Sequence, residues 1–316
     1  MKQDAPIIII YGPTAVGKSA FALALAHRIN GEIINADMGQ LYGPFGIGTA
    51  KPSVDQQEGV PHWLYGCIDE PVDYSGPTYR AAVIEQVAAI RARARVPIIV
   101  GGSGFYCMSL LSTATPLHTR DSLAVPVGAE SIEGSDVQWD TLARIDPVRA
   151  KAIHPNDTYR IARAIAVWHA TRTLPSAYQP IYSPIGEYTV IHLTADRPVL
   201  IERITQRTRA MLAHGWIEEC VQLQGTAWQP FIERKGLIGY ETVFESLRSN
   251  GPIDAEALVH TIAQKTAAYA KRQETYARML IKKIGSWGGD AQVFNLTLSD
   301  IDLYLNQLVS LIQLKR

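Results

Sequence analysis

The sequence predicts an α/β protein with a parallel sheet flanked by helices and one inserted, mainly helical section. Short apolar runs of strand length alternate with longer segments of helical period, and this alternation predicts the sheet. The alternation stops between residues 112 and 184, which predicts the insertion. A chain of 316 residues, of which 47% are hydrophobic, is long enough and apolar enough for such a fold.

The elements of the expected core follow one another along the chain. Before the insertion, strands are predicted at 7–11, 32–36 and 96–100, and helices at 20–29, 78–95 and 105–111. After it, we expect a strand at 188–193, a short apolar piece at 292–294, and helices at 198–214, 216–223, 240–248, 255–283 and 300–314. Repeated β–α–β units imply parallel strands with right-handed crossovers. The core therefore comprises residues 1–111 and 185–316, and the insertion comprises 112–184, with helices near 139–145 and 157–171.

A glycine-rich loop joins the first predicted strand to the first predicted helix. It fits the phosphate-loop pattern Gly-x4-Gly-Lys-Ser/Thr and consists of Gly12, Pro13, Thr14, Ala15, Val16, Gly17, Lys18 and Ser19. The glycines let successive backbone N–H groups point at one anion, and the helix N-terminus adds positive potential. Lys18 supplies a full charge and Ser19 a hydroxyl ligand for Mg2+. We therefore expect a P-loop NTPase-like core that binds phosphate.

An aspartate follows the second predicted strand. ATP-hydrolysing phosphate-loop proteins usually hold Mg2+ with an acid at the end of a hydrophobic strand, but strand 96–100 ends in Gly101-Gly102. The acid at a strand end is instead Asp37. Because ligands of an open α/β sheet lie beyond the C-terminal strand ends, the phosphate loop, Asp37 and residues 101–104 are expected at one crevice. Position alone leaves three roles open for Asp37, namely general base, Mg2+ ligand and structural cap.

Charge and cysteine content restrict the class of protein. A formal net charge of zero disfavours a nucleic-acid partner, yet residues 265–283 carry six basic residues against one acid. That stretch is either a phosphate-binding face or a solvated helix surface, and charge alone favours neither.

Cys67, Cys107 and Cys220 form no CxxC pair, which predicts buried free thiols in a reducing cytoplasm. Without an apolar run of 18 residues or a signal-peptide pattern, neither a membrane span nor a signal peptide is expected.

Several segments, in order along the chain, resemble bacterial tRNA dimethylallyltransferases (tRNA isopentenyltransferases). The resemblance covers the chain from about residue 7 to residue 278 and rests on GPTAVGKS at 12–19, INAD at 34–37 with Gln40 after it, IGTAKP at 47–52, VGGSGFY at 100–106, IHPND at 153–157, RIARAIAVW at 160–168, RAMLAHGWIEE at 209–219 and AKRQ at 270–273. No general phosphate-loop family has all of these segments together.

The resemblance implies a prenyltransferase that modifies tRNA. A dimethylallyl group would move from dimethylallyl diphosphate to the exocyclic amino group of the adenine 3′-adjacent to the anticodon, and diphosphate would leave. At the matching positions, Asp37 would accept the amino proton, Thr14 would contact the bridging oxygen, and Lys18 would bind the diphosphate with the rest of the loop 12–19. Ser19 would hold Mg2+.

The resemblance also implies binding of the tRNA anticodon stem-loop. Contacts are expected at Asp37, Met38, Gly39, Gln40 and Ser103, and at Tyr159, Arg160, Ile161, Ala162 and Arg163. The adenine must be unstacked to reach the crevice, while the inserted section would hold the anticodon stem. A cytoplasmic monomer is expected, with neither a membrane nor an obligate protein partner.

The segment after the aspartate departs from the family's usual pattern. Asp-Ser-Met-Gln is more typical where this chain has Asp37-Met38-Gly39-Gln40, and residues 42–46 replace the usual arginine and acid. Three alternatives are therefore kept: an adenylate (cytokinin-type) isopentenyltransferase that uses free AMP, a small-molecule kinase, and a catalytically impaired homologue that still binds tRNA. The insertion and the segments at 153–163 favour a tRNA acceptor, and the missing acid after strand 96–100 argues against a kinase.

Overall fold

The computed structural model describes residues 6–116, 138–249, 251–287, 292–297, 304–306 and 308–310. The chain forms two compact units, one made of residues 1–108 and 185–316 and the other of residues 109–184. Each unit is described by itself. Among the described residues, no helix combines the length and the apolar character that crossing a bilayer requires.

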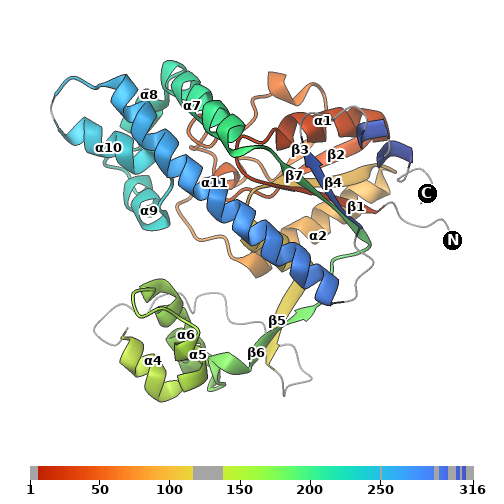
Figure 1. Cartoon of the computed structure of the whole chain (residues 1–316), viewed down its shortest axis with the longest axis vertical. Helices are drawn as coiled ribbons and strands as arrows, with labels where there is room; N and C mark the ends of the chain where they lie inside the picture. The colour runs from red at the N-terminus through yellow and green to blue at the C-terminus, as the bar shows by residue number, and fades with distance from the viewer. Residues whose placement is uncertain are drawn as a thin grey trace. The chain divides into compact units, whose positions relative to one another are not determined.

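The first unit is built on a six-stranded parallel sheet (Figure 1). Its strands lie in the order β3–β2–β4–β1–β7–β8, and their bounds are β1 Ile7–Tyr11, β2 Gly31–Asn35, β3 His62–Trp63, β4 Val96–Gly101, β7 Tyr188–Thr194 and β8 Gln292–Thr297. β1 and β4 are buried along their whole length, as expected for strands of a parallel sheet covered on both faces. The predicted α/β fold with a parallel sheet is confirmed.

Helices follow the strands and bring their apolar faces to the core. They are α1 Lys18–Ile29, α2 Gly76–Ala92, α3 Gly104–Leu111, α7 Arg197–Ala213, α8 Trp216–Leu223, α9 Trp228–Lys235, α10 Tyr240–Arg248 and α11 Ala255–Ser286, with 3-10 turns η1 Gly39–Leu41 and η2 Asp55–Gln57. The buried side chains of α1, including Phe21, Leu25 and Ile29, pack in one cluster with Ile8, Ile98 and other strand residues. The long α11 runs beside α7, where Ala263 and Ala270 contact Ile204 (Figure 1).

In its described residues, the second unit contains the helices α4 Trp139–Ile145, α5 Pro147–Lys151 and α6 Thr158–Thr171, and the 3-10 turn η3 Pro175–Ala177. Its core is formed by residues such as Leu142, Ile161 and Ile165. Two strands that the sequence did not predict, β5 Ser112–Pro116 and β6 Tyr178–Tyr182, pair antiparallel in this unit. The segment 117–137 lies outside the described residues.

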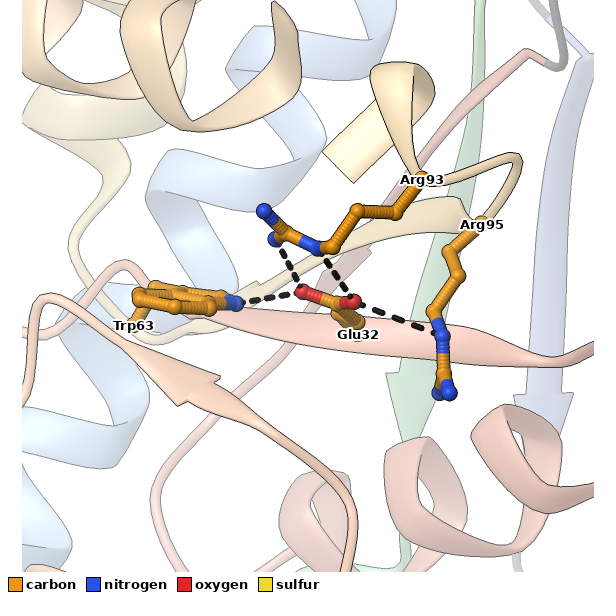
Figure 2. A network of polar contacts seen from close by, with 4 residues as sticks. All are labelled: Glu32, Trp63, Arg93 and Arg95. Atoms are coloured by element: carbon orange, nitrogen blue, oxygen red, sulfur yellow. Dashed lines mark hydrogen bonds and ion pairs between the residues drawn. The ribbon is translucent and has the colours of Figure 1, made fainter. Parts of the chain in front are cut away.

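A buried carboxylate, Glu32, binds the residues that follow the end of α2. The helix was predicted to reach Arg95, but it ends at Ala92, and Ala94 adopts a left-handed φ of 56°. Figure 2 shows the contacts just beyond this end: Glu32, 1% exposed, accepts two hydrogen bonds from Arg93, at 3.0 and 2.6 Å, and one from Trp63 Nε1 at 2.7 Å. Arg95 approaches the same carboxylate at 3.5 Å. These contacts hold the pKa of Glu32 below its ordinary value, although burial alone would raise it.

The remaining differences from the sequence analysis concern one missed helix, the predicted C-terminal helix and the cysteines. Helix α9 was missed, and the predicted helix 300–314 is described only at 304–306 and 308–310, which are helical. The three cysteines are free thiols, as predicted, but only Cys107 and Cys220 are buried, because Cys67 lies in an exposed loop.

Candidate active site

The phosphate loop forms the turn between β1 and α1. Gly17, the residue before the helix, has a φ of 101°, and Ala15 has a φ of 62°, so the backbone curls as the motif requires. Lys18 folds back over the loop and donates hydrogen bonds from Nζ to the carbonyl oxygens of Gly12 and Pro13, at 3.0 and 2.8 Å. Residues 12–17 of the predicted loop thus form a compact turn at the carboxyl end of β1, and Lys18 and Ser19 begin α1.

A cleft of about 260 Å³ opens beside this loop. It is lined by loop residues that include Thr14, Lys18 and Ser19, and by Asp37 and Gln40. Several lining residues were not predicted as site residues, among them Thr49, Ala50, Tyr65 and Arg207. The phosphate loop, Asp37 and Gly101 therefore line the same cleft, as expected for the carboxyl ends of parallel strands.

Asp37 follows β2 directly and is held by its own strand. Its backbone N–H donates to Asn35 Oδ1 at 2.8 Å, and its carboxylate oxygen Oδ1 accepts from the N–H of Gly39 at 3.2 Å. In the described part of the chain, the second oxygen, Oδ2, has no hydrogen-bond partner. Burial raises the pKa of Asp37, while Lys18 and Arg207 oppose that rise. Asp37 is therefore in part a cap of the following turn, and its remaining oxygen is free to accept a proton.

Two cations face this carboxylate. Burial lowers the pKa of Lys18 to about 8, and the charge of Asp37 limits the drop. The guanidinium of Arg207, on α7, is also desolvated, which lowers its pKa from the ordinary value. A desolvated positive charge beside a glycine-rich loop is an electrostatic site for an anion, because each charge acts more strongly away from bulk water.

Thr14 connects the loop to this pair of charges. Arg207 Nη2 donates to Thr14 Oγ1 at 2.6 Å. Because a guanidinium has no acceptor, the threonine oxygen must accept this bond, and its own O–H proton stays available to a ligand in the cleft. Arg207 is a functional candidate to which the sequence analysis assigned no role.

The loop that follows Asp37 closes one side of the cleft. Gln40 Nε2 donates to the carbonyl oxygens of Thr49 and Ala50, at 2.9 and 3.0 Å. The stretch before Thr49 is anchored by Glu219 of α8, whose carboxylate accepts hydrogen bonds from three consecutive backbone N–H groups, those of residues 46, 47 and 48. Tyr240 donates a fourth, at 2.7 Å. The segments IGTAKP and RAMLAHGWIEE, which are far apart in the sequence, meet through this carboxylate.

The other predicted tRNA contacts lie at two places. Met38, Gly39 and Ser103 belong to the first unit, where Ser103 follows β4 and its Oγ accepts from the N–H of Tyr106 at 3.4 Å. Residues 159–163 form the start of α6 in the second unit.

Within α6, the predicted contact residues differ in what they expose. Tyr159 is 67% exposed, and Arg160 is equally exposed but pairs with Asp157 at 3.4 Å. Arg163 has a buried Nη1 without a hydrogen-bond partner among the described residues. Ile161 is 1% exposed and packs in the core of its unit, so a tRNA contact at this position would have to use backbone atoms rather than the side chain.

Comparison with known proteins identifies the family. A family model described as IPP transferase matches residues 40–280. The tRNA dimethylallyltransferase of Geobacter metallireducens is 36% identical over 290 residues, which cover 88% of this chain and 91% of the relative. The chain belongs to the IPP transferase family. The tRNA dimethylallyltransferase of Enterococcus faecalis is 35% identical over 280 residues, covering 86% of this chain and 88% of that one.

Solved structures of IPP transferases have the same fold. The tRNA isopentenylpyrophosphate transferase of Bacillus halodurans aligns with a TM-score of 0.65 and 28% identity, covering 98% of this chain and 96% of its own. A eukaryotic dimethylallyltransferase acting on tRNA aligns with a TM-score of 0.75 and 26% identity, covering 96% of this chain and 77% of that chain. These findings confirm the resemblance recognised in the sequence, and they make the chain a member of a family of transferases.

Proposed function

We propose that this protein transfers a dimethylallyl group from dimethylallyl diphosphate to the exocyclic amino group of the adenine 3′-adjacent to the anticodon of tRNA, releasing diphosphate. The observation that carries the proposal is the single cleft in which a phosphate loop and two cations face the carboxylate of Asp37. Membership of the IPP transferase family supports it.

The reaction needs one bond to break and one to form. The bond between the prenyl C1 carbon and the bridging oxygen breaks, and its electron pair leaves with the diphosphate. The amino nitrogen of adenine forms the new bond to C1 and loses a proton, which Asp37 Oδ2 would accept, since Oδ1 is bonded to the N–H of Gly39. The raised pKa of Asp37 makes its carboxylate a better base than an exposed aspartate.

The departing diphosphate carries the growing negative charge. Backbone N–H groups of the loop, Lys18 and Arg207 would stabilise it, as preorganised donors and charges do for a developing anion. Thr14 would donate its free O–H proton toward the bridging oxygen, because its acceptor side is occupied by Arg207.

Mg2+ fits the residues of this cleft. Mg2+ typically keeps several waters and takes one or two protein oxygens together with substrate phosphates. The cleft offers the hydroxyl of Ser19, at the first turn of α1, and the carboxylate of Asp37, and no group of three or more His, Cys, Asp or Glu ligands occurs in the described part. Ser19 would hold the ion, which supplies positive charge for the diphosphate when bound.

The acceptor is proposed to be the anticodon stem-loop of tRNA. Two features of α6 support this: an exposed aromatic side chain, Tyr159, and two arginines one helical turn apart, Arg160 and Arg163. An exposed aromatic ring can stack on an unpaired base, and guanidinium groups can bind phosphates. We also expect the enzyme to act in the cytoplasm, as a monomer without an obligate protein partner.

Transfer of label from dimethylallyl diphosphate, with Mg2+, tests the proposal. The acceptors are a tRNA with adenine 3′ of its anticodon, the same tRNA with guanine there, and free AMP. Transfer to the adenine tRNA alone is expected. Transfer to AMP in preference to tRNA would indicate the cytokinin-type activity, and tRNA binding without transfer would indicate an impaired homologue.

A further inference from the structure

One buried amide joins the phosphate loop to the loop that follows β4. Gln273 lies on α11 and is 4% exposed. Its Oε1 accepts from the backbone N–H of Thr14 at 2.8 Å, and its Nε2 donates to the carbonyl oxygen of Gly102 at 2.9 Å. The side chain also shares a hydrogen bond with the hydroxyl of Tyr269. Both ends of the amide are therefore used within the cleft region, which fixes its orientation.

The packing leaves this amide little freedom. A Cβ atom at position 102 would lie 2.2 Å from Gln273 Nε2, so the bond needs glycine there. On the other side, Thr14 is bonded twice: its backbone N–H to Gln273 and its hydroxyl oxygen to Arg207, at 2.6 Å. The position of the Thr14 hydroxyl is thus defined by two side chains from α11 and α7.

We propose that Gln273 is a positioning residue for the transfer reaction and acts through Thr14. By bonding both Thr14 and Gly102, Gln273 keeps the phosphate loop at a fixed distance from the Gly102–Ser103 loop. The Thr14 hydroxyl, which donates to the leaving oxygen, is thereby held in place. The inference rests on the proposed function, in which Thr14 assists the departure of diphosphate. Small misplacements of a positioned group cost much of its rate effect, so the loss should appear in kcat.

The first test compares Gln273→Met with Gln264→Met. Methionine keeps the length of the side chain and removes all hydrogen bonds of the amide, including those to Thr14 and Gly102. Gln264 is an exposed glutamine on the same helix that bonds only to His260 among the described residues. We expect kcat of Gln273→Met to fall about 10- to 100-fold, with tRNA affinity unchanged, and Gln264→Met to equal the wild type. A folded Gln273→Met protein with wild-type kcat would overturn the proposal.

A double-mutant cycle tests whether the effect passes through Thr14. If it does, the variant with both Thr14→Ala and Gln273→Met loses no more activity than Thr14→Ala alone. Losses that multiply would show that Gln273 acts independently of Thr14, and the proposal would be wrong. If Gln273 only stabilised the fold, the losses of the two single variants would multiply in the double variant, because a general loss of stability does not depend on the Thr14 hydroxyl.

A pH profile of Gln273→Glu provides a second signature. When protonated, the carboxyl has one acceptor and one O–H donor and can make both bonds of the amide; when ionised, it has no donor for the Gly102 carbonyl. The titration of Asp37 affects both proteins and cancels in the ratio of variant to wild-type kcat. This ratio should therefore rise as pH falls. A ratio that stays constant with pH contradicts the proposed geometry.

Failure of the proposed function can be distinguished from failure of this inference. If the wild type transfers no prenyl group to any acceptor, the function is refuted, and the same cycle is measured on the dissociation constant of inorganic pyrophosphate with Mg2+. Weaker binding in Gln273→Met that is absent in the Thr14→Ala background supports positioning. Unchanged pyrophosphate binding in Gln273→Met refutes it.

Discussion

Replacement of Glu219 by glutamine should destabilise the protein and loosen one wall of the cleft. Glu219 Oε2 accepts from the N–H groups of Gly46 and Ile47, at 2.9 and 2.7 Å, and Oε1 accepts from the N–H of Gly48 at 3.1 Å and from Tyr240 at 2.7 Å. An amide retains only one oxygen. In the more favourable of its two orientations, the amide oxygen still accepts from the N–H groups of Gly46 and Ile47. The NH2 group then donates to the Tyr240 hydroxyl, which can accept this hydrogen bond.

The N–H of Gly48 then loses its carboxylate acceptor and keeps only the Tyr240 hydroxyl, at a cost of at most about 1–3 kcal/mol. The two retained bonds change from a charged to a neutral acceptor and lose about 1 kcal/mol each, since charged acceptors contribute more. Partial relaxation of the loop reduces the sum, so we expect Glu219→Gln to lower the free energy of unfolding by about 2–4 kcal/mol.

Urea denaturation followed by tryptophan fluorescence measures this change, because Trp216 packs edge-on against Tyr240 at 5.6 Å between ring centroids. Glu218→Gln is the matched control: it changes the preceding, exposed residue of the same helix and should remain within about 0.5 kcal/mol of wild type. Hydrogen exchange should accelerate at residues 46–48 in Glu219→Gln only. Equal stability of the two variants and unchanged exchange at these amides would refute the argument.

Three other predictions concern the cleft and the tRNA. Asp37→Ala should reduce prenyl transfer about 100-fold or more and leave tRNA binding nearly intact; unchanged turnover would remove Asp37 from the mechanism. With its pKa lowered to about 8, Lys18 loses its charge as pH rises through that value, so kcat/KM for dimethylallyl diphosphate should fall on the alkaline side; a Lys18→Arg variant that keeps the same alkaline limb would contradict this assignment. Replacing Arg160 and Arg163 together by alanine should weaken tRNA binding and make its dependence on log salt shallower by about 1–2; an identical slope would leave both arginines with only structural roles.

Local signals in the sequence were sufficient for much of the fold. The strand Ile7–Tyr11, the loop after it and helix α1 are adjacent in sequence, so their pattern is complete within a short window. The pairing of β5 with β6 was not predictable in this way, because Thr113 pairs with Ile181 across the whole second unit. Helix α9 was missed although Trp228, Phe231 and Ile232 have the i, i+3, i+4 spacing of a helical face, a signal that could have found it.

The same distinction applies to the candidate site. Thr14, Lys18 and Asp37 were predicted because a motif or a strand end marks each of them. Arg207 and Gln273 were not assigned roles, because their contacts with Thr14 span 193 and 259 residues of sequence and depend on how α7 and α11 pack. A local pattern identifies which groups carry the chemistry, whereas the groups that orient them come from tertiary packing.

The atypical segment after Asp37 is compensated within this chain. Tyr42 and Phe45 are fully buried, and their rings lie 5.6 Å apart. They pack edge-on against Phe231 and Trp228 of α9, at 5.0 Å in each case, and Tyr42 donates a hydrogen bond to a backbone carbonyl at 2.8 Å. Aromatic packing therefore fixes the stretch that the sequence analysis expected to be atypical, and Glu219 holds residues 46–48. Asp37 is positioned by Asn35 and by the backbone N–H of Gly39, a donor that does not depend on the side chain at position 39. These changes should therefore leave its carboxylate in place, which favours an active enzyme over an impaired homologue.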